Sequence, residues 1–218
     1  MTVGMGDEPH HLPVLYQQIL SYLAPFSPGK YLDCTAGAGG HSSGILEASA
    51  PDGALLAIDL DPRAVALTSA KLAPYGDRAI VRHGSYLHSG EFLRELGWEK
   101  VDGILLDPGV SSMQLDEAER GFSFRQDGPL DMRFDPSSGP SAADLVNHLE
   151  EKELAEILWK YGEERFSRRI ARAIVRARPL QTTSELAGIA RSVLGRTQEK
   201  QDPATRTFQA LRIAVNDE

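Results

Sequence analysis

Short apolar segments alternate with amphipathic segments through the first half of the chain. Four apolar runs predict strands: Tyr31–Cys34, Ala54–Asp59, Ala79–Arg82 and Val101–Leu106. Helices are expected between these runs at residues 40–52, 62–73 and 88–96, and a shorter helix is expected before them at Leu12–Leu23. Strands that alternate with helices imply right-handed crossovers and a parallel sheet. The pattern therefore predicts an α/β fold for this half.

The second half of the chain follows a different pattern. Residues 108–140 are rich in Gly, Pro, Ser and Asp, which predicts one long ordered loop. Helical periodicity begins at Ser141, and a helix is expected over Glu153–Tyr161 with Gly162 as its stop. The segment Thr182-Thr183-Ser184-Glu185 has the form of a capping box and predicts another helix that ends at Gly195. The chain is thus expected to form an α/β unit followed by a helical unit.

Arginines recur at helical spacing over the segment Glu163–Arg176. An apolar stripe is formed by Phe166, Ile170, Ala173 and Ile174, and a cationic stripe by Arg165, Arg169, Arg172 and Arg176, with Arg168 and Arg178 beside it. One interpretation is a solvated face, partly paired with Glu163 and Glu164. The other is a surface that follows nucleic-acid phosphates, inside a protein whose net charge is −8.

Composition is that of a globular domain, with 218 residues, 41% of them hydrophobic and 25% charged. No run approaches the ~18 apolar residues of a membrane span, and Met1 to His11 is polar and acidic, without the apolar core of a signal peptide. The single cysteine, Cys34, excludes an internal disulfide and is expected to be a small core residue. Together these features indicate a cytoplasmic protein.

A glycine-rich turn follows the first predicted strand, in the run from Asp33 to His41. Asp59 comes twenty positions after Gly39, at the tip of the second predicted strand. A strand, a glycine turn into a helix, a second strand and an acid at its tip form a nucleotide-binding half-site. Ser42 stands where a dinucleotide fingerprint has its third glycine, which disfavours a nicotinamide or flavin and favours S-adenosylmethionine (SAM).

Two further strand tips reach the same edge of a parallel sheet. Tyr86 follows the third strand and either lays its ring against an adenine or packs as a half-buried aromatic. Asp107 ends an apolar run, so we expect either a backbone cap or a ligand to satisfy its carboxylate. His41 either caps the helix that it opens or contacts the cofactor. The six histidines are scattered and form no metal set.

Several long motifs resemble one known family. They are Thr35-x-Gly37-x-Gly39-Gly40-His41-Ser42, Ile58-Asp59-x-Asp61-Pro62, Asp107-x-Gly109-Val110-Ser111-Ser112-x-Gln114-Leu115-Asp116, Arg120-Gly121-Phe122-Ser123-Phe124, Asp127-Gly128-Pro129-Leu130-Asp131-Met132-Arg133, Tyr161-Gly162-Glu163-Glu164 and Pro203-Ala204-Thr205-Arg206-Thr207-Phe208-Gln209-Ala210. From His11 onward the chain resembles the bacterial small-subunit ribosomal RNA cytosine-N(4) methyltransferase family, also called MraW.

The resemblance implies a Rossmann-like class I SAM-dependent methyltransferase core with an inserted all-helical domain. It implies methylation of the exocyclic amine of one cytidine in the decoding region of small-subunit ribosomal RNA. By motif matching, cofactor contacts fall on Gly39, Gly40, His41, Asp59, Tyr86, Asp107 and Gln114. Asp107 is also the candidate catalytic acceptor for a hydrogen bond from the amine. No membrane or metal partner is expected, and the oligomeric state is left open.

Two departures from the family accompany the resemblance. Pro108 stands where the family usually has leucine. The chain also stops at Glu218, and its last helix, with Asp202 as N-cap, is expected to end without a C-cap. The expected division is a cofactor-binding core at 1–115, a loop and helical insertion at 116–202, and a helix returning to the core at 203–218.

The shortened chain leads to a structural expectation and to competing functions. A sheet of order 3-2-1-4 would leave the apolar fourth strand as an unpaired edge, as in a C-terminally truncated protein. A class I methyltransferase with another substrate, and a fragment that binds SAM or RNA without turnover, therefore compete with the ribosomal RNA methyltransferase. A nicotinamide oxidoreductase is a more distant alternative because of Ser42.

Overall fold

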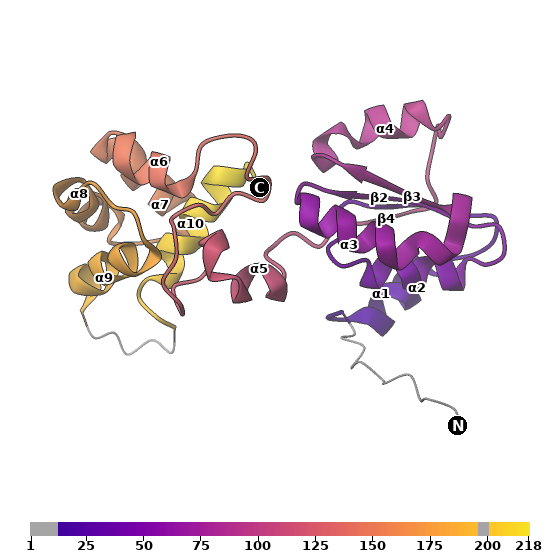
Figure 1. Ribbon diagram of the computed structural model, residues 1–218, viewed down its shortest axis with the longest axis horizontal. Coiled ribbons are helices and arrows are strands. Elements are labelled where there is room, and N and C mark those ends of the chain that lie inside the picture. Colours follow the sequence, from indigo (N-terminus) through magenta and orange to yellow (C-terminus); the bar gives the residue numbers. More distant parts are fainter. Residues whose placement is uncertain (1–12, 196–200) are drawn as a thin grey trace, which may run out of the picture. The chain divides into compact units, whose positions relative to one another are not determined.

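The computed structural model describes residues 13–195 and 201–218, and the prediction for Met1–His11 lies outside them. The chain divides into two compact units, Met1–Asp107 and Pro108–Glu218 (Figure 1). The division falls eight residues before the expected boundary at 115. Each unit has its own hydrophobic core.

The first unit is a four-stranded parallel sheet with the order β3-β2-β1-β4, as the sequence predicts (Figure 1). The strands are β1 (Lys30–Asp33), β2 (Ala54–Asp59), β3 (Ala79–His83) and β4 (Gly103–Leu105). The helices and turns between them are α1 (Tyr16–Leu23), α2 (Gly40–Ala48), α3 (Pro62–Leu72), η1 (Ala73–Arg78), η2 (Tyr86–His88) and α4 (Ser89–Glu95). This α/β arrangement confirms the predicted fold class.

Side chains of β2 alternate between the two faces of the sheet, as the period of a strand requires. Leu55 and Ala57 pack with residues of α1, α2 and α3 on one face. Leu56 and Ile58 pack with Trp98 and residues of α4 on the other. Both faces of the sheet are therefore covered, which explains why the predicted strands are apolar throughout.

Strand β4 lies at an edge of the sheet, because among the described residues it pairs with β1 alone. Leu105 is buried, but Ile104 is 58% exposed and Leu106 is 50% exposed. The expected unpaired apolar edge is therefore present in this structure.

The second unit is built from helices around one apolar core. They are α5 (Ser112–Asp116), η3 (Ala118–Arg120), α6 (Ala142–His148), α7 (Glu151–Gly162), α8 (Ser167–Ala177), α9 (Thr183–Leu194) and α10 (Thr205–Asn216). The expected loop over 108–140 is thus interrupted by α5 and η3. From Gly121 the loop is ordered by contacts with the core, where Leu130 and Met132 are buried.

The end of α7 and the start of α8 differ from the sequence prediction. Gly162 does not stop α7 but is its last residue, and Glu163, with a φ of 50°, forms the C-cap. A side chain at Gly162 would approach the carbonyl of Arg206 in α10 to 2.5 Å, so this glycine allows α7 and α10 to pack closely. The next helix begins at Ser167 rather than Glu163, because Glu164 Oε1 accepts a hydrogen bond from the Phe166 N–H at 2.8 Å.

The last helix also corrects an expectation. Asp202 Oδ1 accepts a hydrogen bond from the Ala204 N–H at 2.9 Å, but α10 itself begins at Thr205. Asp217 caps its end with a φ of 52°, so the helix does not lack a C-cap. Phe208 and Leu211 of α10 belong to the core of the helical unit, which makes the segment 203–218 part of that unit here.

Candidate cofactor-binding site

The glycine loop begins where β1 ends and leads into α2. Gly37 and Gly39 have φ angles of 54° and 74°, in the left-handed region that favours glycine. Gly39 is the N-cap of α2, and a side chain there would approach Thr68 to 3.3 Å. At Gly37 a side chain would meet only the carbonyl of Thr35, at 4.0 Å, so the loop is open on that side.

Asp59, at the tip of β2, is joined directly to this loop. Its Oδ2 accepts a hydrogen bond from the Gly37 N–H at 2.8 Å, and its Oδ1 accepts one from the Asp61 N–H at 2.9 Å. Burial raises the pKa of the Asp59 carboxyl, and the backbone hydrogen bonds oppose the rise. Each oxygen of a carboxylate can accept more than one hydrogen bond, so capacity remains for ligand hydroxyls.

Asp33 and Ser42 form a buried pair under the loop that the sequence analysis missed. Ser42 Oγ donates to Asp33 Oδ2 at 2.6 Å, and the Thr35 N–H donates to Asp33 Oδ1 at 3.1 Å. Both side chains are fully buried. Burial raises the pKa of the Asp33 carboxyl to about 6, although both hydrogen bonds oppose the rise. Ser42, which stands where a dinucleotide fingerprint has its third glycine, is therefore the hydrogen-bond partner of Asp33. The sequence did contain a sign of this pair, because Asp33 is a charged residue at the end of an apolar strand.

His41 lies in the first turn of α2. Its ring stacks on Tyr16 with centroids 5.9 Å apart, and both ring nitrogens are shielded from solvent. No side chain caps α2 by a hydrogen bond, so the alternative in which His41 caps its own helix is wrong. Burial lowers the pKa of the imidazole, and the Asp107 carboxylate opposes this.

Asp107 follows β4 and is exposed, because β4 lies at the edge of the sheet. The sequence analysis expected a backbone cap or a ligand to satisfy this carboxylate, and its exposure leaves it accessible to a ligand. Its backbone N–H donates to Thr35 Oγ1 at 2.9 Å, which ties the tip of β4 to the tip of β1. Thr35 is a second site residue that the sequence analysis did not single out.

The other predicted residues are distributed between the two units. Tyr86 begins η2 and is half-buried against the core cluster that contains Trp98. Gly40 is the first residue of α2. Gln114 belongs to the second unit, where it is buried and its Oε1 accepts a hydrogen bond from the Ser111 N–H at 2.9 Å in a capping box. The structure thus brings Gly39, Gly40, His41, Asp59 and Asp107 to the strand tips of one unit, and Gln114 to the other.

Two features that accompany many sites are not found in the part of the chain that is described. No group of three or more His, Cys, Asp or Glu side chains there could hold a metal ion. None of the described helices has the length and apolarity to cross a membrane. Cys34 is buried, as predicted, and burial raises the pKa of its thiol to about 11.

A parallel sheet of order 3-2-1-4, with a glycine loop after its first strand and an acid after its second, defines a Rossmann-like class I methyltransferase core. The chain belongs to the MraW methylase family, whose model matches residues 8–218.

Curated relatives of the chain carry the name ribosomal RNA small subunit methyltransferase H. The protein of Geotalea uraniireducens (strain Rf4) is 52% identical over 214 residues, which are 96% of this chain and 69% of that protein. The relative from Azorhizobium caulinodans is 52% identical over 220 residues, covering 100% of this chain and 63% of the relative. That from Dehalococcoides mccartyi (strain ATCC BAA-2266) is 49% identical over 208 residues, 95% of this chain and 60% of its own length. The chain therefore spans 60 to 69% of the length of these relatives.

Proposed function

We propose that this chain binds SAM and serves a methyltransferase that modifies the exocyclic N(4) amine of a cytidine in the decoding region of small-subunit ribosomal RNA. The names of relatives at 49 to 52% identity support the ribosomal RNA substrate. The observation that carries the proposal is the hydrogen bond between the Gly37 N–H and Asp59, because it couples the glycine loop to the acid of the second strand.

The residues of the first unit fit such a cofactor. The open side of the loop at Gly37 leaves room for the amino acid end of SAM, and the Asp59 carboxylate can accept hydrogen bonds from two ribose hydroxyls. Tyr86 is half-buried, so one part of its ring can lie against an adenine. The proposed cofactor contacts in this unit are Gly39, Gly40, His41, Asp59, Tyr86 and Asp107, while the contact proposed for Gln114 of the second unit rests on motif matching alone.

The chemistry requires activation of a poor nucleophile. When bound, SAM supplies an electrophilic methyl group on a sulfonium centre. The lone pair of the cytosine amine is delocalised into the ring, so the protein must position this amine and favour a more pyramidal nitrogen. Asp107 is exposed at the strand tips, and its carboxylate can accept a hydrogen bond from the amine N–H. The hydrogen bond from the Asp107 N–H to Thr35 would hold this acceptor in place.

The substrate base must also reach the site. An amine that is paired in an RNA helix is not accessible to an acceptor on a protein surface, so the target cytidine has to leave its stack. This cost favours RNA in which the target nucleotide is already unpaired.

Methyl transfer from isotopically labelled SAM to small-subunit ribosomal RNA tests the proposal, with the modified nucleotide mapped by mass spectrometry. The chain and a longer relative are assayed side by side, together with the Asp107→Asn variant of each. We expect the variant to lose about 10²-fold or more in turnover, within the range of general acid–base contributions. Unchanged turnover would remove Asp107 from the chemistry, and methylation at another atom or on another RNA would overturn the substrate assignment.

A binding-only function is the second candidate, because the chain spans only part of the length of its relatives. Calorimetric titration with SAM separates the two functions. Binding of SAM by this chain without transfer, when the longer relative transfers, would assign cofactor binding alone to these 218 residues.

A further inference from the structure

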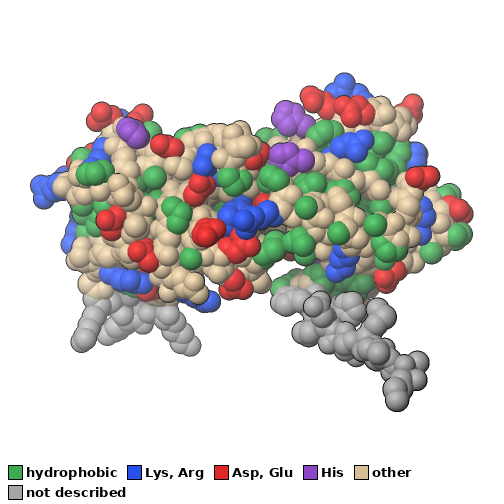
Figure 2. Space-filling view, viewed as in Figure 1, with side chains coloured by type: hydrophobic (Ala, Val, Ile, Leu, Met, Phe, Trp, Pro, Cys, Tyr) green, Lys and Arg blue, Asp and Glu red, His purple; other side chains and the backbone are tan. Residues whose placement is uncertain are grey.

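A groove of about 690 Å³ lies between α7 and α8 of the helical unit. Its lining includes Trp159 from α7, together with Arg165, Phe166, Arg168, Arg169 and Arg172 from α8 and the turn before it. On the face shown in Figure 2, separate basic side chains lie at the end of this unit where Figure 1 shows α8, with acidic side chains near them. The volume is in the range of small-ligand sites, which is enough for one or two nucleotides.

The groove exposes two large aromatic side chains that the core does not use. Trp159 is 61% exposed and Phe166 is 46% exposed. The Arg169 guanidinium lies over the Phe166 ring, 5.3 Å from its centroid. Exposed flat rings beside arginines are the arrangement on which unpaired bases stack in single-strand-binding proteins.

The cations of the groove are only partly neutralised by neighbouring acids. Arg172 pairs with Glu151 at 3.3 Å, and Lys152 lies 4.0 Å from Glu156. Arg169 donates to the carbonyl of Val193 at 3.1 Å, so its charge is not cancelled by an acid there. Arg165 and Arg168 are exposed and make no ion pair with any residue in 13–195 or 201–218.

The acids expected to neutralise the arginine stripe do not do so. The Glu164 carboxylate is buried and accepts its hydrogen bond from the backbone N–H of Phe166. Glu163 forms the C-cap of α7 through its backbone, and its side chain makes no ion pair with another described residue. Arg178 is also not part of the groove, because its guanidinium donates to the carbonyls of Val146 and Leu149 at the end of α6. The groove is therefore a local cationic surface on an acidic protein.

We propose that this groove binds single-stranded RNA, with a base stacked on Trp159 and backbone phosphates held by Arg165 and Arg168. This inference rests on the proposed function and names where the helical unit would hold the RNA substrate. Unpaired RNA fits because a duplex keeps the faces of its bases inside the helix, where an indole ring cannot reach them.

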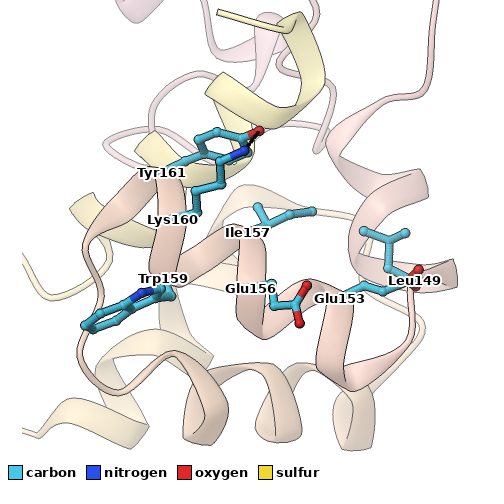
Figure 3. A pocket seen from close by; sticks show the side chains of 7 residues that line it. All are labelled: Leu149, Glu153, Glu156, Ile157, Trp159, Lys160 and Tyr161. Atoms are coloured by element: carbon cyan, nitrogen blue, oxygen red, sulfur yellow. Dashed lines mark hydrogen bonds between the residues drawn. The ribbon is translucent and has the colours of Figure 1, made fainter.

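A neighbouring hollow of about 540 Å³ shares Trp159 and Glu156 with the groove but, unlike the groove, has more acids than cations (Figure 3). It is lined by Glu153 and Glu156, and its one cation, Lys160, donates to the Tyr161 hydroxyl at 3.2 Å. An acidic hollow repels phosphates. The strand is therefore expected on the α8 side of the Trp159 ring.

The test measures binding of a fluorescently labelled single-stranded RNA of about 12 nucleotides, a length in the range of single-strand sites. Anisotropy gives the affinity of the 218-residue chain over a series of salt concentrations. We expect Trp159→Ala to weaken binding about tenfold, through loss of one stacked base. Trp159→Phe keeps an aromatic ring and is expected to retain most of the affinity.

The arginines are tested through the salt dependence of binding. The double variant Arg165→Gln with Arg168→Gln loses two phosphate contacts, so the slope of log affinity against log salt should fall by about 1.4. Arg176→Gln is the matched control, because Arg176 is exposed on the same helix but does not line the groove. The control should leave the slope near that of the unmodified chain.

Intrinsic fluorescence gives a signal from the groove itself. The chain has two tryptophans, and Trp98 is only 9% exposed. Bound RNA should therefore quench Trp159, and the quenching should disappear in Trp159→Phe while anisotropy still reports binding. Equal affinity for duplex RNA, or for a poly-glutamate peptide of equal charge, would show that stacking plays no part and overturn the proposal.

The outcomes separate this inference from the proposed function. Methyl transfer to ribosomal RNA together with unchanged affinity of all groove variants would overturn the groove alone. RNA binding that depends on Trp159, Arg165 and Arg168, without methyl transfer by the longer relative, would overturn the proposed function alone. A chain that binds no single-stranded RNA overturns the groove assignment, while its SAM titration still tests the cofactor site.

Discussion

The backbone N–H of Asp107 donates a hydrogen bond to the hydroxyl of Thr35, 2.9 Å away and 72 residues earlier in the chain. It continues the β1–β4 ladder, in which the Cys34 N–H donates to the Leu105 carbonyl at 2.9 Å. A side chain thus replaces the backbone as acceptor at the point where the two strands separate. The position of Asp107 depends on this contact.

Thr35→Val should free the Asp107 N–H without changing the shape of the side chain. We expect the free energy of unfolding of the first unit to fall by about 1 kcal/mol, the typical net value of one hydrogen bond. Hydrogen exchange at the Asp107 amide should become faster, whereas Thr35→Ser keeps the acceptor and should preserve its protection. Equal exchange rates in all three proteins would contradict the role given to Thr35.

Asp59→Ala should weaken SAM binding about tenfold or more, because it removes the carboxylate that accepts hydrogen bonds from the glycine loop and, as proposed, from the ribose of the ligand. Calorimetric titration measures the effect. Asp52→Asn is the control, since Asp52 is exposed and lies before β2 rather than at its tip. Equal losses in the two variants would mean that Asp59 acts only through the net charge.

Asp33 should make the stability of the first unit depend on pH. Its folded-state pKa of about 6 lies above the ordinary 3.8, so the folded protein binds more protons between these values. Stability should therefore fall as pH rises from about 4 to 6, by about 3 kcal/mol for this group. Asp33→Asn can accept from the Thr35 N–H and donate to Ser42, so it should flatten this dependence and stabilise the unit above pH 6.

Denaturant unfolding between pH 4 and 8 checks this expectation. Trp98 belongs to the first unit and Trp159 to the second, so a Trp159→Phe background lets Trp98 report on the first unit alone. A profile with the same slope in Asp33→Asn would show that other groups carry the pH dependence.

The sheet could be predicted from sequence because its strands are apolar on both faces, so each is a continuous run bounded by turn residues. Strand tips then converge by topology, which is why Gly39, Asp59 and Asp107 could be placed at the same edge of the sheet from the sequence. Contacts that depend on register could not be predicted. The Thr35–Asp107 hydrogen bond requires β1 and β4 to align as Asp33 with Leu105, and the sequence does not specify this alignment.

The edge position of β4 and the packing of α7 against α10 also could not be predicted from local sequence patterns. An apolar run usually indicates burial, but β4 is paired on one side, so Ile104 and Leu106 are exposed while Leu105 is buried. Gly162 was interpreted as a helix stop because glycine commonly ends helices. Its place is instead determined by the backbone of α10, which follows more than 40 residues later.

Two helical glycines, Gly162 and Gly188, allow the close packing of α7 and α10 to be tested by the same substitution at each position. Gly162→Ala would place a methyl group 2.5 Å from the Arg206 carbonyl, and overpacking of this kind costs about 1–3 kcal/mol. Gly188→Ala in α9 meets no atom within 4 Å and should stabilise the second unit by about 1 kcal/mol through helix propensity. Thermal unfolding followed at Trp159 should therefore give shifts of opposite sign. A stabilising effect of Gly162→Ala would contradict the close packing of α7 and α10.

Arg178 should act in stability rather than in RNA binding. Its guanidinium donates to the Val146 carbonyl at 2.6 Å and to the Leu149 carbonyl at 2.5 Å, so it satisfies acceptors at the end of α6. Arg178→Ala should lower the free energy of unfolding of the second unit by about 1–3 kcal/mol. RNA affinity of the folded variant should stay unchanged, and a specific loss of RNA affinity without loss of stability would reverse this assignment.

Within the described ranges, β4 has a strand partner on one side only, and this has a consequence for the protein in solution. Its backbone donors and acceptors, flanked by the protruding Ile104 and Leu106 side chains, can act as a template for an extended segment of another molecule. Light scattering at increasing protein concentration would then reveal self-association that a lysine at position 104 suppresses. Self-association would thus be controlled by the edge of one short strand rather than by the charged surface.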